Sequence, residues 1–237
     1  MESNKTILPF LFPWNDGKGG KHDLMGMFRS RTFTLTYVCV TLFIWNVIGP
    51  GHWSNCVTLG ERLACGAGIW PNKMVEAPHE FVISFFTAPW FHNSGEHIFF
   101  VTLGTLIFTQ SFEGHNGTKK TLALFFGGVA VVSVIYGANM HIGHHYYPEN
   151  TLYSGGLNRM WTGGSVGFMT LIGALSHHTR RLWVVPAILL GFEYWNRYYN
   201  GISTYITLAH LTAALFGFVV WGWWLSKNDE QTVDAPQ

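Results

Sequence analysis

Six apolar segments constrain the fold of this chain most strongly, because each is close to the length of a membrane-spanning helix. A helix needs roughly 20 mainly apolar residues to cross a bilayer. The 237 residues are 48% hydrophobic and only 11% charged, too few charges to cover a water-facing surface, since soluble domains average about 25%. The segments lie at about 32–49, 97–112, 121–140, 164–175, 182–195 and 205–225. We therefore predict an all-α, polytopic membrane bundle with six transmembrane helices.

The lysine and arginine residues predict how the bundle is oriented. Cytoplasmic segments are enriched in these residues. With the N-terminus inside, ten of the 14 fall on the cytoplasmic side and four on the outer side. This predicts a cytoplasmic segment at 1–31, a membrane domain at 32–225 with a long outer loop at about 50–80, and a disordered cytoplasmic tail at 226–237. Both termini are then cytoplasmic.

Charge and cysteine content bound the partners. The net charge of +1 gives no basic field for nucleic acid, so the lipid bilayer is the expected surrounding. Cys56 and Cys65 both fall in the first loop. If that loop lies outside the cytoplasm, the two are candidates for a disulfide.

Polar side chains at four places in or beside the apolar segments suggest function, because such groups are costly in lipid. They are His92 and His97 before the second segment, Ser165 in the fourth, Glu193 in the fifth and His210 in the sixth. We interpret Glu193 as a glutamate packed near a helix end.

Ser165 and His210 are predicted to meet. His210 is flanked by Ala209, Ala213 and Gly217 at small-residue spacing, which allows another helix to approach closely. The glycine-rich segment that carries Ser165 is the expected partner, and both segments enter the bilayer from outside. A serine becomes nucleophilic when an adjacent base takes its proton. The alternative is a small packing serine and a histidine bonded to a backbone carbonyl.

Several short motifs, in order between about Glu80 and Gly217, resemble the rhomboid intramembrane serine proteases. The two histidines in "HNSGEHIFF", the turn "FEGHNGTKK", and the glycines at 163 and 173 around Ser165 match that family. So does Ala209-His210 with small residues three and seven positions later. The resemblance implies a dyad of Ser165 as nucleophile and His210 as general base, with His97 stabilising the oxyanion and no cofactor. The implied substrates are single-span membrane proteins, cleaved near the outer face.

The sequence also departs from the rhomboid pattern: it lacks the Trp-Arg pair of the first loop, where "HEFVISFFTAPW" stands, and it differs at three single positions. Val101 replaces an asparagine that supplies an oxyanion donor, Val166 replaces a glycine, and Met169 replaces an aromatic residue next to the catalytic histidine. These departures leave open a second hypothesis. In it, the chain is a catalytically inactive rhomboid-like protein that binds membrane clients or is an accessory subunit of a larger membrane complex.

A third hypothesis comes from the histidine spacing. Two patterns, H-x-x-x-x-H and H-x-x-H-H, resemble boxes of di-iron membrane oxygenases and desaturases, and imidazole is a good iron ligand. The candidate ligands are His92, His97, His141, His144 and His145. The predicted topology disfavours this site, because these histidines face outside.

Overall fold

The computed structural model describes residues 7–16, 20–49 and 56–233. These residues form helices joined by loops, with isolated β-bridges at Asn15–Lys21 and Ile69–Trp161. The all-α prediction is therefore confirmed. Residues 1–6, 17–19, 50–55 and 234–237, which belong to the predicted N-terminal segment, first loop and tail, lie outside this description.

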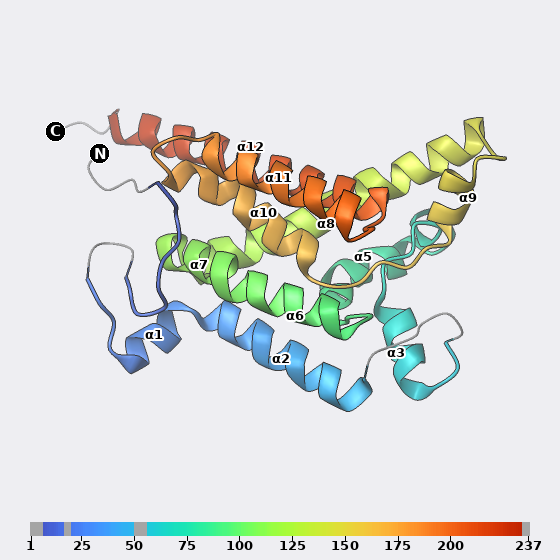
Figure 1. Cartoon of the computed structure of the whole chain (residues 1–237), viewed down its shortest axis with the longest axis horizontal. Helices are drawn as coiled ribbons and strands as arrows, with labels where there is room; N and C mark the ends of the chain where they lie inside the picture. The colour runs from blue at the N-terminus through green and yellow to red at the C-terminus, as the bar shows by residue number, and fades with distance from the viewer. Residues whose placement is uncertain (1–6, 17–19, 50–55, 234–237) are drawn as a thin grey trace.

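The main helices run back and forth between two ends of the molecule, and the N-terminal segment lies at the same end as the last turns of α12 (Figure 1). In chain order the elements are α1 (Leu24–Ser30), α2 (Thr32–Ile48), α3 (Leu59–Ala67), α4 (Lys73–Glu76), α5 (Pro78–Thr87), η1 (Ala88–Trp90), α6 (Gly95–Gly104), η2 (Thr105–Thr109), α7 (Gln110–Asn116), α8 (Thr118–Tyr146), α9 (Thr151–Leu157), α10 (Ser165–Leu175), η3 (Ser176–His178), α11 (Val184–Tyr199) and α12 (Thr204–Val233).

Two helices among the described residues are long and apolar enough to cross a membrane: α8 and the Thr204–Leu225 part of α12. The pair α1 and α2, bent by 80°, is a third candidate. The prediction of six spans is thus not confirmed by length and composition, although every predicted segment overlaps a helix. The reason is length: α2, α10 and α11 have 17, 11 and 16 residues, and π-helical η2 separates α6 from α7.

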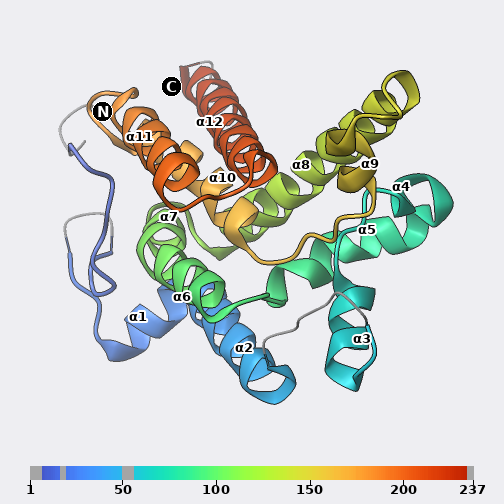
Figure 2. The ribbon, with the colours of Figure 1, turned by 45° about the vertical axis from the view of Figure 1, so that its right-hand side comes forward.

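Helix α10 lies inside the bundle, between α8, α11 and α12 (Figure 2), and packs against α6, α8, α11 and α12. Nearly all of its residues are buried. A Cβ on Gly173 would lie 2.7 Å from the carbonyl carbon of Ala214, and one on Gly217 would lie 2.7 Å from that of Thr170. Helices α10 and α12 therefore touch through their backbones, as the small-residue spacing around His210 predicted.

A buried glutamate fixes the start of α2. The Glu113 carboxylate on α7 accepts hydrogen bonds from the backbone N–H groups of Phe33 and Thr34, at 2.8 and 2.9 Å, and from the Thr34 hydroxyl at 2.7 Å. The first N–H groups of a helix have no partner within the helix, so this carboxylate satisfies them from a neighbouring helix. The contact holds α2 against α7.

Two further predictions can be compared with the structure. The sulfur atoms of Cys56 and Cys65 form a disulfide, with the Cα atoms 6.1 Å apart, so that prediction is confirmed. The predicted disordered tail at 226–237 is wrong for its first part, because α12 continues to Val233. The Lys227 ammonium lies 4.3 Å from the ring centre of Trp223 one turn earlier, a cation–π contact that favours helix beyond the apolar segment.

Candidate active site

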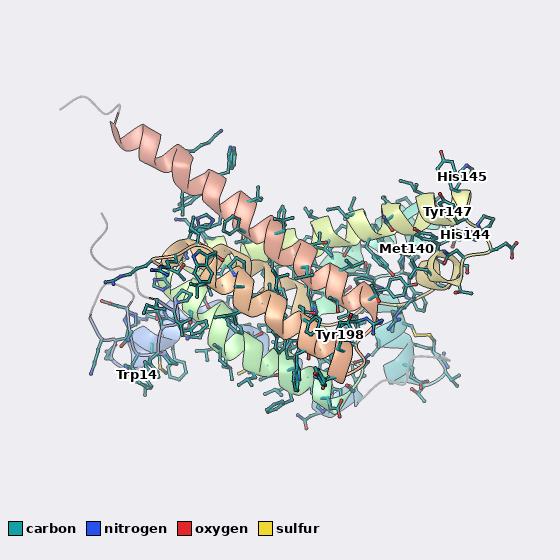
Figure 3. The ribbon with its side chains drawn as sticks, turned by 45° about the horizontal axis from the view of Figure 1, so that its top comes forward. Trp14, Met140, His144, His145, Tyr147 and Tyr198 are labelled. Atoms are coloured by element: carbon teal, nitrogen blue, oxygen red, sulfur yellow. A yellow bond between two sulfur atoms is a disulfide. The ribbon has the colours of Figure 1, made fainter. Side chains whose placement is uncertain are left out.

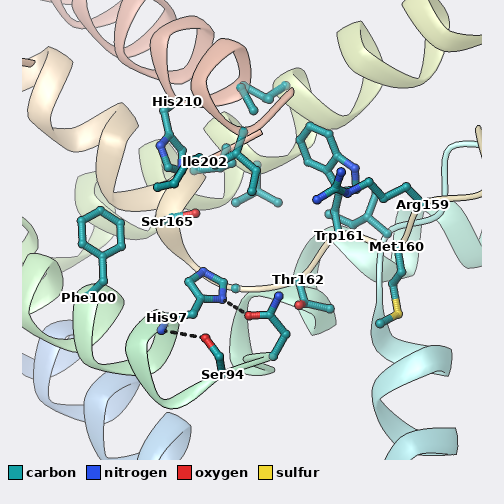
Figure 4. A pocket seen from close by; sticks show the side chains of 18 of the residues that line it. Ser94, His97, Phe100, Arg159, Met160, Trp161, Thr162, Ser165, Ile202 and His210 are labelled. Carbon is teal, nitrogen blue, oxygen red and sulfur yellow. Dashed lines mark hydrogen bonds between the residues drawn. The ribbon is translucent and has the colours of Figure 1, made fainter. Parts of the chain in front are cut away.

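A cavity of about 670 Å³ contains the three predicted site residues. Its walls come from α6, α8, α10, α11, α12 and the loop at 159–163. Figure 4 shows His97, Ser165 and His210 around this space, with His210 coming from the helix above Ser165. The fold therefore brings three residues that are far apart in the sequence to the walls of one cavity.

Ser165 is the first residue of α10 and is 7% exposed. The loop before it is held in place by the Ile69–Trp161 bridge and by the hydrogen bond from the Gly163 N–H to the Ala88 carbonyl, at 2.9 Å. Gly163 has φ of +95°, which L side chains rarely adopt. The free N–H groups and dipole of a helix N-terminus favour negative charge. The Ser165 hydroxyl thus stands where an anion would be stabilised.

His210 is held by a carboxylate. Its Nδ1 atom lies 2.8 Å from Oε1 of Glu193 on α11, and the two side chains are only 4% and 1% exposed. This contact occupies one ring nitrogen and leaves Nε2 for another partner. Imidazole with one occupied nitrogen can act as a general base through the other.

Ser165 and His210 share the cavity without a direct hydrogen bond among the contacts drawn in Figure 4. The backbone contact between α10 and α12 sets their spacing. In sites without substrate, catalytic hydrogen bonds are often long and shorten only when substrate binds.

His97 lies against the loop that leads to Ser165. A Cβ on Gly163 would be 2.8 Å from His97 Nε2, so this approach requires glycine. The His97 Nδ1 atom is 3.0 Å from Oδ1 of Asn93, and the His97 backbone N–H donates to Ser94 Oγ at 3.1 Å. For Nε2 to donate to an oxyanion, Asn93 must offer its NH₂ group to Nδ1, or His97 must be protonated.

The three single-position departures from the rhomboid pattern have different surroundings. Val101 is 0% exposed and Met169 is also in the core, whereas Val166 lines the cavity. An aromatic neighbour of His210 is supplied from another helix, because the Phe100 ring on α6 lies 6.4 Å from the imidazole, centre to centre. The aromatic neighbour thus comes from α6 rather than from the helix that carries Ser165.

The histidines of the metal hypothesis are not gathered into one site. The rings of His92 and His97 are 5.0 Å apart, but His141 Nε2 contacts the Pro71 carbonyl at 2.9 Å. His144 and His145 lie at the far end of α8 (Figure 3). Within the described part of the chain, no three His, Cys, Asp or Glu side chains form a group that could hold a metal ion.

Sequence reasoning gave no role to Asn93, and it interpreted Glu193 as a glutamate packed near a helix end, whereas Glu193 lies inside α11 (Val184–Tyr199) and contacts His210. Glu193 was noticed as an acid in an apolar segment, but the sequence does not give the relative rotation of α11 and α12 that points it at His210. Asn93 lies just before Ser94, the N-cap of α6, four residues before His97, and no sequence signal pointed to its contact with the imidazole.

No family model, curated protein or solved structure matches the chain.

Proposed function

We propose that this protein is an intramembrane serine endopeptidase of the rhomboid type. The observation that carries the proposal is that Ser165, at the N-terminus of buried helix α10, shares one cavity with His210 on the helix that touches α10 through glycine. A nucleophile, a base and a helix N-terminus around one space are the parts that acyl transfer requires.

The cavity residues suggest the following steps. The Ser165 hydroxyl gives its proton to His210 Nε2 while Oγ attacks the scissile carbonyl carbon. The oxyanion is stabilised by the Ser165 N–H and by His97. The imidazolium then gives its proton to the departing amine nitrogen, leaving an acyl-enzyme. Water attacks the ester through the same base, releases the new carboxylate and restores the Ser165 hydroxyl.

The proposed membrane setting has six spans and both termini in the cytoplasm. Short helices such as α10 are compatible with a bilayer because they are surrounded by protein rather than lipid, and irregular backbone at membrane depth is tolerated where it lines a cavity. The polar side chains of Asn196 and Asn200 line the cavity, and in this proposal water reaches Ser165 past them. The proposed substrates are single-span membrane proteins whose helix unwinds near the outer face.

A second candidate function is favoured by one observation. Val101, at the position where rhomboid proteases have an oxyanion donor, is fully buried in the core and cannot donate a hydrogen bond. Loss of one such donor costs about 10²–10³-fold in rate in a soluble serine protease. An inactive rhomboid-like protein that binds membrane clients, or serves as a subunit of a complex, is consistent with this loss.

Fluorophosphonate labelling of the purified protein in detergent distinguishes the two functions. We expect the wild type to be labelled, and Ser165→Ala and His210→Ala to lose the label. Matched controls are Ser154→Ala and His145→Gln, which lie outside the cavity and should be labelled as the wild type is. A folded wild type that stays unlabelled, while an active rhomboid protease reacts in parallel, contradicts the protease and supports the client-binding protein.

A further inference from the structure

The contact between His210 and Glu193 is the best-defined polar interaction beside the cavity. It joins α12 to α11 over a sequence separation of 17, at 2.8 Å, and both side chains are buried. The neighbours of Glu193 on α11 point elsewhere, because Phe192, Tyr194 and Trp195 are exposed on the surface of the bundle. Glu193 is thus an acid that the helix directs inward, toward one imidazole nitrogen.

A buried carboxylate at this position is costly if its only use is to join two helices. A well-packed apolar residue often stabilises such a place as much as a buried ion pair or more. Leu189, one turn earlier on α11, shows that an apolar side chain is accommodated in the same packed core. The choice of glutamate therefore points to an effect on His210 rather than to helix packing.

We propose that Glu193 is a positioning residue for His210, so that the site works as a Ser–His–Glu triad; this rests on the proposed protease function. The resemblance to rhomboids implied a dyad without an acid, and this role is an addition to it.

The chemistry of the role follows from where the proton sits. When His210 Nδ1–H donates to the Glu193 carboxylate, the lone pair is on Nε2, where it can accept the Ser165 proton. The imidazolium formed by that transfer then has its second N–H already bonded to a negative charge. A protonated Glu193 would instead donate to Nδ1, place the hydrogen on Nε2 and remove the base.

The test combines labelling rates with a direct reading of the His210 tautomer. Fluorophosphonate labelling rates are measured for the wild type, Glu193→Gln, Glu193→Asp and the exposed control Glu149→Gln. Spectra of ¹⁵N-histidine-labelled protein report the tautomer, with the His210 signals identified by their loss in His210→Gln. The tautomer of His210 is measured on the folded protein, so this measurement does not depend on enzymatic activity.

We expect the wild-type His210 to carry its hydrogen on Nδ1. Glu193→Gln should shift part of the population to the Nε2–H tautomer and slow labelling about 10²–10⁴-fold, as expected when the acid of a triad is removed. Glu193→Asp, which keeps the carboxylate on a shorter stem, should recover part of the rate, and Glu149→Gln should match the wild type. If Glu193→Gln does not fold, the aspartate variant with an intermediate rate provides the same comparison.

Two results overturn the inference and differ from each other. Normal labelling and an unchanged tautomer in folded Glu193→Gln, with only a lower melting temperature, would mean that Glu193 merely joins α11 to α12. The proposed protease function of Ser165 and His210 would not be affected by this result. A folded wild type that is never labelled would overturn the protease and the role of Glu193 together.

Discussion

Replacing Gly217 with alanine tests whether the contact between α10 and α12 positions Ser165 and His210. The new Cβ would lie 2.7 Å from the carbonyl carbon of Thr170. Ordinary carbon contacts begin at about 3.5 Å, and the Thr170 carbonyl oxygen would lie closer still to the new Cβ, so the helices must separate by about 1 Å or more. Overpacking of this kind costs about 1–3 kcal/mol, and each kcal/mol lowers Tm by about 2–4 °C in a chain of this size, so we expect a fall of roughly 2–12 °C.

The same displacement should slow the chemistry. A misplacement of about 1 Å in a catalytic site can cost 10²-fold in rate, so the fluorophosphonate labelling rate of Gly217→Ala should fall by about that factor. Gly127→Ala on α8 is the matched control, because a Cβ there has nothing within 4 Å. Thermal unfolding and labelling rates are measured on both variants in the same detergent. If Gly217→Ala equals Gly127→Ala in both measurements, the reasoning about helix contact is refuted.

Three further predictions follow from the same structure. Val101→Asn should lower Tm without raising the labelling rate, because burying the amide costs about 1–3 kcal/mol and Val101 does not line the cavity; faster labelling would contradict this. The Cys56–Cys65 disulfide joins two residues that are 9 positions apart in the sequence, so its reduction should destabilise the protein by about 2–3 kcal/mol. Equal melting curves with and without reductant would contradict this prediction. Glu113→Ala should cost about 1–3 kcal/mol for each of the two N–H groups at the start of α2 that lose their acceptor. The folded molecules should keep their labelling rate; a labelling rate that falls together with stability would show that Glu113 also affects the site.

The sequence was sufficient to predict the long apolar helices and the pairing of two of them. Apolar runs located α2, α6, α8, α10, α11 and α12 because burial in lipid or protein demands continuous apolar surface, but they did not locate α3, α5 and α9, which lie between the predicted segments. The small residues at Gly173 and Gly217 predicted close helix contact, because only there can two backbones touch. Helix length was less predictable, since an apolar run such as 164–175 can be a short buried helix as well as a full span.

The polar contacts around the cavity could not be predicted in the same way. The pairing of Glu193 with His210 depends on how α11 is rotated against α12, and neither helix carries a local signal for that rotation. The Phe100 ring next to His210 likewise comes from α6, not from the neighbouring sequence. Glu113 was noticed only as part of a turn, whereas its carboxylate caps the first turn of α2 at Phe33, 80 residues earlier in the chain.

The most direct test of a nucleophilic Ser165 is to locate the fluorophosphonate adduct by mass spectrometry. Trypsin releases the peptide from Met160 to Arg180, which contains both Ser165 and the buried Ser176. Fragment ions distinguish the two serines. We predict up to one adduct per chain, on Ser165, and none in His210→Ala. An adduct on Ser176 or on another residue, or an unmodified chain under conditions that label an active rhomboid protease, would contradict the proposed active site.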